Sequence, residues 1–392
     1  MQHYDTTRHS GLRSLFLLII LFGLCACAKL SNTASLSDVI DESHFPQYSN
    51  YSLENSEQIF ALNDEAIAFV DEVTAPHSFD SNKLAALVSA IFHRSKLAIE
   101  YSAEANTVAN DTFKNGTANC LSLTIMAYSM AEYLGFETRF NDVAVPEFWT
   151  RRDGNTLING HINLQLTPQP SMRNIAMRTR PFVVDFDPLQ EKHNFRTKHL
   201  SKQQIVSYFY VNKAAEAMIA EAYDLAFAYL KAAINLDKRN SGAYLNLGVL
   251  YSRNKLYDLA ELAYEYAIEH KPGYSAALEN LAGIYNKTGR SIAAKRIHEK
   301  LQDKRESNPY YHFKLGELAL EKKDYQAALK HYQKAIAINS SSHEFHFRVA
   351  TVYAAMGDIA NTKRYLKNAR KRAKTDDLEQ LYADKLSIFA GR

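Results

Sequence analysis

Residues 241–274 read SGAYLNLGVLYSRNKLYDLAELAYEYAIEHKPGY, and the pattern of this stretch returns every 34 residues. Units that begin at positions 241, 275, 309 and 343 place small, aliphatic and aromatic residues in the same columns. In the first unit these columns hold Tyr244, Leu247, Gly248, Tyr251, Ala260, Tyr264, Ala267 and Pro272. A fixed period of this length is typical of repeat proteins. Small residues let two helices approach closely while aromatic residues fill the adjoining gaps, so each unit is predicted to be a helical hairpin stacked on its neighbours.

All eight columns resemble the consensus of the tetratricopeptide repeat. The resemblance weakens but persists upstream, where residues 207–240 keep Tyr210, Ala214, Ala226, Leu230 and Ala233. It therefore implies five repeats over residues 207–376, closed by a capping helix in residues 377–392. The expected architecture is an all-α superhelix whose consensus residues pack against one another. His346 falls in one of these packing columns, so we expect no metal site there. A ligand is expected on the concave face.

Length and composition restrict the class of protein. A chain of 392 residues is long enough for two or three domains, and 46% hydrophobic residues with 23% charged residues indicate folded, globular domains. The formal net charge of +3 lacks the basic excess that nucleic-acid binding requires. Three cysteines cannot form a disulfide framework, so each needs its own explanation.

The amino terminus has the layout of a secretory signal. Arg8 and Arg13 precede the apolar run LFLLIILFGL at residues 15–24, which is shorter than the roughly 20 residues that span a bilayer. The following Leu24-Cys25-Ala26-Cys27 resembles the lipobox of bacterial lipoproteins. That resemblance implies a signal peptide over residues 1–26 and a lipid-modified Cys27. The alternative is an uncleaved anchor or an ordinary signal peptide.

The lipobox resemblance also implies a location. Lys29 occupies the position where Asp would favour retention in the inner membrane, so we expect the bacterial cell envelope, with the lipid anchor in the outer membrane and the protein facing the periplasm. Several acyl chains would make the membrane anchor durable. Residues 27–56 contain the Ser- and Asn-rich stretches SNTASLSD and QYSNYSLENS, which predict a flexible tether.

The segment ANCLSLTIMAYSMAEYL at residues 118–134 predicts a helix that ends at Gly135. Cys120 lies in its first turn. The exposed backbone amides and the dipole at a helix amino terminus stabilise an anion, which favours the reactive thiolate form of a cysteine. The alternative is that Cys120 is a small buried core residue, as many cysteines are.

Two strand-like runs follow, HINLQL at residues 161–166 and FVVDF at residues 182–186. They contain His161 and Asp185. A cysteine at a helix start followed by a strand histidine and a strand aspartate resembles the transglutaminase-like cysteine enzymes. The resemblance implies that residues 57–206 form an α+β transglutaminase-like (papain-like) domain. It also implies a thiol enzyme, either a cysteine peptidase or amidase, or a transglutaminase-like acyltransferase.

Acyl transfer from an amide needs a nucleophile, a base that later acts as an acid, and a group that orients the base. The resemblance assigns these roles to Cys120, His161 and Asp185. Asp187, two residues further along the same strand, is the alternative acid. Further candidates for the oxyanion site or for supporting contacts are Trp149, Asn119 and Asn163. No cofactor and no metal are expected.

Two functions remain open at this point. In the first, the repeats hold an envelope protein or peptide while Cys120 attacks one of its amide bonds. In the second, the chain is a non-catalytic scaffold or adaptor for envelope assembly, with a degenerate transglutaminase-like domain. In both cases the lipid anchor contacts the membrane and no nucleic acid is involved.

Overall fold

The computed structural model describes residues 36–92, 97, 99–102, 105–144, 149–152, 155–158, 161–167, 181–185, 196–373 and 376–389. Contacts between Cα atoms divide the chain into Met1–Asp41 and Glu42–Arg392. In the first unit the structure describes a short helix, α2 (Leu36–Val39). The predicted signal peptide over residues 1–26 and the lipid-modified Cys27 lie outside the described residues, so both stay predictions. All elements below belong to the second unit.

Short helices open the second unit and lead to a longer one. They are α3 (Ser56–Phe60), α4 (Asp64–Thr74), α5 (Asp80–Phe92), α6 (Ala109–Asn115) and α7 (Cys120–Tyr133). Asn55, Asn63 and Asn119 each cap a helix start with a side-chain oxygen that accepts a backbone N–H, which satisfies an amide that has no partner inside the helix. The predicted helix that carries Cys120 is confirmed, but it begins two residues later than predicted because Asn119 caps it. Gly135 follows the helix with a φ of +77°.

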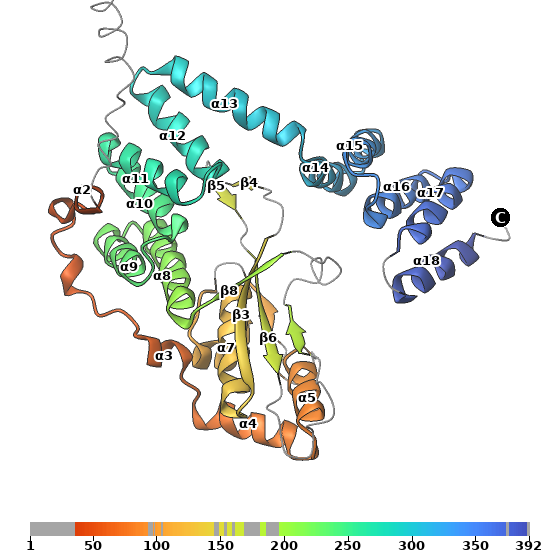
Figure 1. Cartoon of the computed structure of the whole chain (residues 1–392), viewed down its shortest axis with the longest axis horizontal. Coiled ribbons are helices and arrows are strands. Elements are labelled where there is room, and N and C mark those ends of the chain that lie inside the picture. Colours follow the sequence, from red (N-terminus) through yellow and green to blue (C-terminus); the bar gives the residue numbers. More distant parts are fainter. Residues whose placement is uncertain are drawn as a thin grey trace, which may run out of the picture. The chain divides into compact units, whose positions relative to one another are not determined.

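An antiparallel sheet packs against α7. It contains β3 (Glu137–Val143), β6 (His161–Thr167), β7 (Phe182–Val184) and β8 (Thr197–Leu200), in the order β7-β6-β3-β8 (Figure 1). Alternation along the strands buries Phe140, Leu164 and Val184 on one face. Tyr128 of α7 stacks on Phe140 with ring centroids 4.4 Å apart, so this face is the one that α7 covers. The predicted strands at 161–166 and 182–186 are thus present, the second of them shorter.

Two further strand pairs complete the described part of this region. A short parallel pair joins β1 (Glu100–Tyr101) to β2 (Thr117–Ala118). An antiparallel pair joins β4 (Trp149–Arg152) to β5 (Asn155–Ile158).

The remainder of the chain is a series of five helical hairpins and a final helix. Their helices are α8 (Lys202–Ile219), α9 (Tyr223–Leu236), α10 (Ser241–Arg253), α11 (Tyr257–His270), α12 (Ser275–Lys287), α13 (Ser291–Glu306), α14 (Pro309–Glu321), α15 (Tyr325–Ile338), α16 (His343–Ala355), α17 (Ile359–Lys371) and α18 (Asp376–Ile388). Four hairpins begin at 241, 275, 309 and 343, where the period placed them. The first begins at Lys202, upstream of the predicted boundary at 207, because Ser201 and Gln204 form a capping box.

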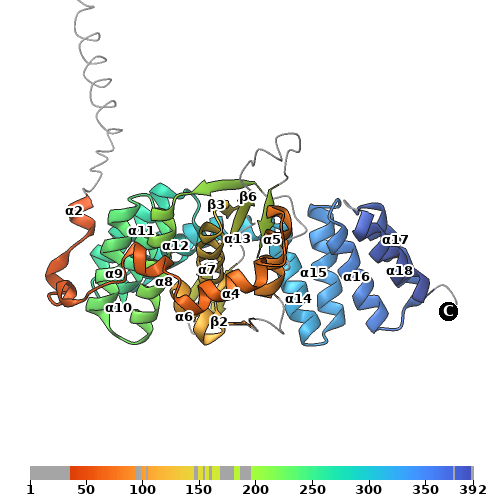
Figure 2. The same ribbon diagram turned by 90° about the horizontal axis from the view of Figure 1, so that it is seen from below.

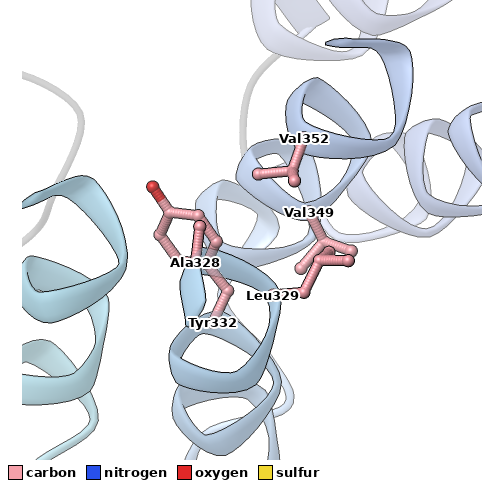
Figure 3. Close-up of a cluster of buried hydrophobic side chains, with 5 residues drawn as sticks. All are labelled: Ala328, Leu329, Tyr332, Val349 and Val352. Atoms are coloured by element: carbon pink, nitrogen blue, oxygen red, sulfur yellow. The ribbon is translucent and has the colours of Figure 1, made fainter. Parts of the chain in front are cut away.

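Consecutive hairpins share small apolar cores. Figure 3 shows one, in which Ala328, Leu329 and Tyr332 of α15 meet Val349 and Val352 of α16. Figure 2 shows α14 to α18 arranged side by side along the array. The consensus residues are therefore packing residues, as the periodicity predicts.

The predicted tether over residues 27–56 is wrong for its second half. Phe45 is 2% exposed and stacks on Phe227 of α9, with ring centroids 4.7 Å apart. Tyr48 contacts the same ring edge-on at 5.4 Å. A Ser- and Asn-rich composition suggested flexibility, but these two aromatic side chains anchor the segment to the first repeats. We call residues 42–54 the N-terminal strap.

Charged and polar contacts add to the aromatic anchors at both ends of the strap. Glu42 pairs with Lys231 at 2.6 Å (Oε1 to Nζ). The hydroxyl groups of Tyr229 and Tyr210 donate to the carboxylate and to the backbone carbonyl of Glu54, at 2.7 and 2.6 Å. The strap thus covers the first hairpin of the array, which has no preceding repeat to pack against.

Among the described residues, none of the helices combines the length and the apolar character needed to cross a membrane. The same residues contain no group of three or more His, Cys, Asp or Glu side chains arranged to hold a metal ion.

Candidate functional site

Cys120 is the first residue of α7 and is half-buried. The preceding Asn119 is the helix cap, and its side-chain oxygen accepts the Ser122 backbone N–H at 2.8 Å. Asn119 is itself 7% exposed, so its observed role is to fix the start of the helix. The thiol therefore sits at the positive end of a 14-residue helix, the environment that stabilises a thiolate.

The path of the backbone brings the start of β6, where His161 lies, to the end of the sheet near the start of α7. The turn at Gly135 reverses the chain, so β3 runs back along α7 (Figure 1). At about 1.5 Å per helical residue and about 3.3 Å per strand residue, the 14 residues of α7 and the 7 of β3 have similar lengths. Val143 therefore ends near the helix start. His161 is paired with Val143, and α7 packs against both β3 and β6.

Asp185 directly follows β7. Its Oδ2 accepts a hydrogen bond from Nδ2 of Asn163 at 3.5 Å. Position 163 lies two residues beyond His161 on β6, so Asp185 is diagonal to His161 across the strand pair. Asp187 lies outside the described residues. Trp149 is placed as the first residue of β4, opposite Ile158.

The structure adds two side chains that the sequence patterns did not single out. Asn141 of β3 donates from Nδ2 to Oδ1 of Asn163 at 3.0 Å, and His199 of β8 contacts Oδ1 of Asn141 through Nδ1 at 2.7 Å. With Asp185 they form a polar row across the sheet. Sequence reasoning missed both because it could not tell which strands are neighbours.

A loop at residues 105–107 connects the start of α7 to the first repeat helix. On the α7 side, the Thr107 backbone N–H donates to Oγ of Ser122 at 2.8 Å, and the Asn119 N–H donates to the Ala105 carbonyl at 3.0 Å. On the repeat side, Nδ2 of Asn106 donates to the Phe209 carbonyl of α8 at 3.1 Å. We call residues 105–107 the bracket loop.

The bracket loop also reaches the inner surface of the repeats. Asn212 of α8 donates from Nδ2 to Oδ1 of Asn106 at 3.4 Å. The 34-residue period places Asn246 and Asn280 at the same position of the next two hairpins, and all three side chains are half-buried. We call Asn212, Asn246 and Asn280 the asparagine row. Lys314 and Arg348 take this position in the last two hairpins.

The asparagine row lies on the first helices of successive hairpins. These helices touch one another, since α10 packs against both α8 and α12. The layer in which neighbouring hairpins approach through their first helices is the concave side of a repeat superhelix, the usual binding surface. The asparagine row could have been found from the sequence, because the 34-residue period places the same amide at a position that is not a packing column.

Burial raises the pKa of two side chains of α8, Tyr208 and Glu216. Burial first, and then the carboxylates of Asp142 and Asp237, raise the pKa of Tyr208 to about 12. Its hydroxyl therefore stays protonated at neutral pH and remains a donor. Burial also raises the pKa of Glu216, against the opposing effect of Lys213. The first repeat helix thus contributes polar groups beside Asp142 of β3 and beside Asn106 of the bracket loop.

Two stretches of the chain match the tetratricopeptide repeat family, residues 241–274 and 309–342. Both begin at the residues where the period starts a unit, which confirms tetratricopeptide repeats in the carboxyl-terminal part. Repeats of this kind support protein–protein interaction. The uncharacterized protein ycf37 of Guillardia theta is 37% identical over 81 residues, which make up 19% of this chain and 46% of that protein. The chain thus spans about half the length of this curated relative.

Several solved structures show distant similarity. YrrB, described as a tetratricopeptide-repeat protein with an unusual peptide-binding site, is 18% identical with a TM-score of 0.24, over 46% of this chain and 92% of YrrB. PilF of Pseudomonas aeruginosa is 15% identical with a TM-score of 0.26, over 48% of this chain and 90% of that one. MamA is 17% identical with a TM-score of 0.24, over 43% and 91%.

Proposed function

We propose that this chain is an envelope-anchored thiol enzyme of the transglutaminase-like type, which acts on an amide of a protein held by its repeats. The observation that carries the proposal is the bracket loop. It bonds the first turn of the Cys120 helix on one side and the first member of the asparagine row on the other. A polypeptide lying along the repeats would therefore be led towards the thiol.

The chemistry follows from the three candidate residues. In this proposal the Cys120 thiolate attacks the amide carbonyl carbon, and the backbone N–H of Cys120 stabilises the oxyanion. The C–N bond then breaks, the amine leaves with a proton from His161, and a thioester remains. Water or an amine attacks the thioester, gives a proton to His161 and releases the thiolate. Asp185, or Asp187 in its place, orients the imidazole.

The asparagine row suits an extended peptide as the bound partner. Each side-chain amide offers both a donor and an acceptor, which matches the alternating N–H and C=O groups of a peptide backbone. Nδ2 of Asn246 is engaged with the Val211 carbonyl at 3.3 Å, which fixes the side chain in place. Binding through backbone groups would tolerate many sequences.

A non-catalytic adaptor is the second candidate function. It is favoured by the half-buried state of Cys120, which is also what a packing cysteine would show. In this case the repeats would still bind a protein. The sheet domain, which comprises α7 and the four-stranded sheet of β3, β6, β7 and β8, would only support the repeats.

Alkylation of Cys120 in the full chain distinguishes the two functions. Iodoacetamide should label Cys120 rapidly at neutral pH, His161→Gln should slow the labelling, and Cys120→Ser should abolish both labelling and function. The matched control is His298→Gln, because His298 is exposed on α13. If Cys120 reacts no faster than a free thiol and its replacement changes nothing in the cell, the adaptor function is correct.

Peptide binding is tested separately. Asn246→Ala and Asn280→Ala should each weaken the binding of an extended polypeptide, such as a reduced and unfolded carrier protein, by about fivefold, which corresponds to about one hydrogen bond. Asn286→Ala is the control, since Asn286 lies exposed on the same helix as Asn280. Equal losses in all three variants would argue against the asparagine row as the binding surface.

The type of acyl transfer and the lipid anchor can each be measured directly. Incubation with a labelled primary amine separates transfer from hydrolysis, because only a transferase incorporates the label. The intact mass of the membrane-extracted protein tests the anchor. A mature chain that begins at Cys27 should carry the added mass of acyl chains, and a chain without this mass would refute lipid anchoring.

A further inference from the structure

Four polar side chains form a row that crosses the sheet from edge to edge. They belong to β8, β3, β6 and the residue after β7, and the row follows the strand order because position 141 is paired with both 163 and 199. Nδ1 of His199 lies 2.7 Å from Oδ1 of Asn141, whose Nδ2 is 3.0 Å from Oδ1 of Asn163. Nδ2 of Asn163 completes the row at 3.5 Å from Oδ2 of Asp185.

The carboxylate at one end of the row determines which atom of each amide donates a hydrogen bond and which accepts one. An ionised Asp185 only accepts hydrogen bonds, so Asn163 must present its amide nitrogen to it and its oxygen to Asn141. Asn141 in turn presents its nitrogen to Asn163 and its oxygen to His199. It follows that His199 carries a proton on Nδ1.

The middle and the far end of the row differ in exposure. Asn141 is 3% and Asn163 is 7% exposed, and buried amides are costly unless they are paired. His199 is exposed and borders a pocket of about 280 Å³, formed where β8 ends at Leu200 while β3 continues. The row thus connects a surface imidazole to Asp185 through two buried amides.

We infer that Asn141 and His199 are positioning residues, which orient the Asn163 amide so that it holds the Asp185 carboxylate. The inference rests on the proposed function, in which Asp185 orients His161. It deepens that function, because the acid of the triad is then fixed from the opposite edge of the sheet. A network in which every member is satisfied restricts each side chain to one orientation.

Nitrogen-15 NMR of the full chain tests the row without any activity. The His199 ring should carry its proton on Nδ1 in the wild type. Asn141→Asp keeps the size and an acceptor for His199 but cannot donate to Asn163 while it is ionised. It should therefore keep the His199 tautomer and shift the side-chain amide resonance of Asn163. An Asn163 resonance that does not move, or a His199 proton on Nε2 in the wild type, would overturn the inference.

The pH profile of Cys120 alkylation tests the link to the site. Asn141→Asp and Asn163→Leu should shift the profile to higher pH and lower the rate at pH 7 about tenfold, because a less firmly held Asp185 stabilises the His161 imidazolium, and with it the thiolate, less well. Gln165→Leu is the control, because Gln165 is a half-buried amide on the same strand. Lower thermal stability with an unchanged profile would mean a purely structural row. If the wild-type thiol is inert, the proposed function fails, and the NMR measurement alone decides whether the row holds Asp185.

Discussion

Gly248 and Gly316 stand at the same column of two repeats, and each lies against an aromatic ring. A Cβ added to Gly248 would come 2.5 Å from the Tyr264 ring, and one added to Gly316 would come 2.5 Å from the Tyr332 ring. Both tyrosines are buried, so neither ring has room to move away. The column is glycine because the ring of the second helix fills the space that a side chain would need.

Gly248→Ala and Gly316→Ala should each lower the free energy of unfolding by about 1–3 kcal/mol, the usual cost of overpacking. Gly283 provides the control, since it lies inside α12 with nothing within 4 Å of an added Cβ. Gly283→Ala should raise stability by about 0.5–1 kcal/mol through helix propensity. Urea unfolding of the three variants measures the expected loss and the expected gain of stability. A Gly248→Ala variant as stable as the wild type would contradict the packing argument.

His346 replaces a tyrosine at an equivalent position of the repeat. Tyr244 donates its hydroxyl to the carbonyl six residues upstream, that of Lys238, at 3.0 Å. His346 contacts the carbonyl of Ser340, also six residues upstream, through Nε2 at 3.3 Å. Its Nδ1 is buried and has no partner among the described residues. Burial first, and then the charge of Arg372, lower the pKa of His346 below 6.5, against the opposing effect of the Ser340 carbonyl.

A lowered pKa in the folded state makes the last repeats sensitive to acid. The unfolded chain binds the proton more readily than the folded chain, so the stability contributed by neutral His346 is complete above pH 6.5 and declines as the pH falls below it. His346→Tyr should reduce this pH dependence, because a tyrosine makes the same contact without titrating in that range. Unfolding midpoints between pH 7.5 and 5 give the measurement, and equal slopes for both proteins would show that His346 does not contribute.

At the scale of elements, the N-terminal strap is the clearest case of a segment whose composition is misleading. Its Ser and Asn residues are typical of a flexible linker, yet Phe45 is as deeply buried as the repeat core. Phe45 and Tyr48 are two aromatic residues within four positions, and a pattern this short does not indicate a docking segment in the sequence. Their partners, Phe227 and Tyr251, lie about two hundred residues further along the chain.

Phe45→Ala should lower the free energy of unfolding of the first hairpin by about 3–5 kcal/mol, the typical cost of truncating a buried phenylalanine. Hydrogen exchange in α8 and α9 should rise while α15 to α17 stay unchanged, since each repeat contacts only its neighbours. Tyr51→Ala is the control, because Tyr51 is 41% exposed. Similar exchange in both variants would mean that the strap does not stabilise the first hairpin.

The starts of the last four hairpins, in contrast, were predictable from the sequence to the residue. The period repeats the same local pattern four times, so each of these four starts is supported by several independent copies. The start of α8 was missed by five residues because Ser201 and Gln204, which cap it, lie outside the 34-residue unit. The capping box occurs once in the sequence, and the divergent first repeat has no periodic pattern that would indicate the same helix start.

At the scale of the whole molecule, the bracket loop joins the sheet domain to the repeats. Asn106 is 4% exposed, donates to the Phe209 carbonyl and accepts from Asn212. These bonds make the start of α7 and the start of the array one continuous polar contact. The buried Asn106 amide is therefore one direct link between the segment beside α7 and the first repeat helix.

Asn106→Leu should destabilise this junction by about 1–3 kcal/mol, because it removes the side-chain donor to the Phe209 carbonyl and the acceptor of the Asn212 side-chain amide. In the wild type a polypeptide bound to the repeats should change the rate of Cys120 alkylation. Asn106→Leu should abolish this effect, while binding through Asn246 and Asn280 changes little. Asn110→Leu is a suitable control, since Asn110 bonds the Asn63 backbone N–H away from the repeats. If a bound polypeptide still changes the rate of Cys120 alkylation in Asn106→Leu, the bracket loop does not connect the repeats to the thiol.

The sequence by itself determined the repeats, their register, and the helix that begins at Cys120. These features depend on residues close together in the chain, and caps, turns and a fixed period record them locally. Only the tertiary structure showed that His199 and Asn141 share a row with Asp185, that the N-terminal strap docks on the first hairpin, and that the bracket loop reaches the asparagine row. Each of these depends on which distant segments become neighbours, and strand order and docking leave no periodic mark in a single sequence.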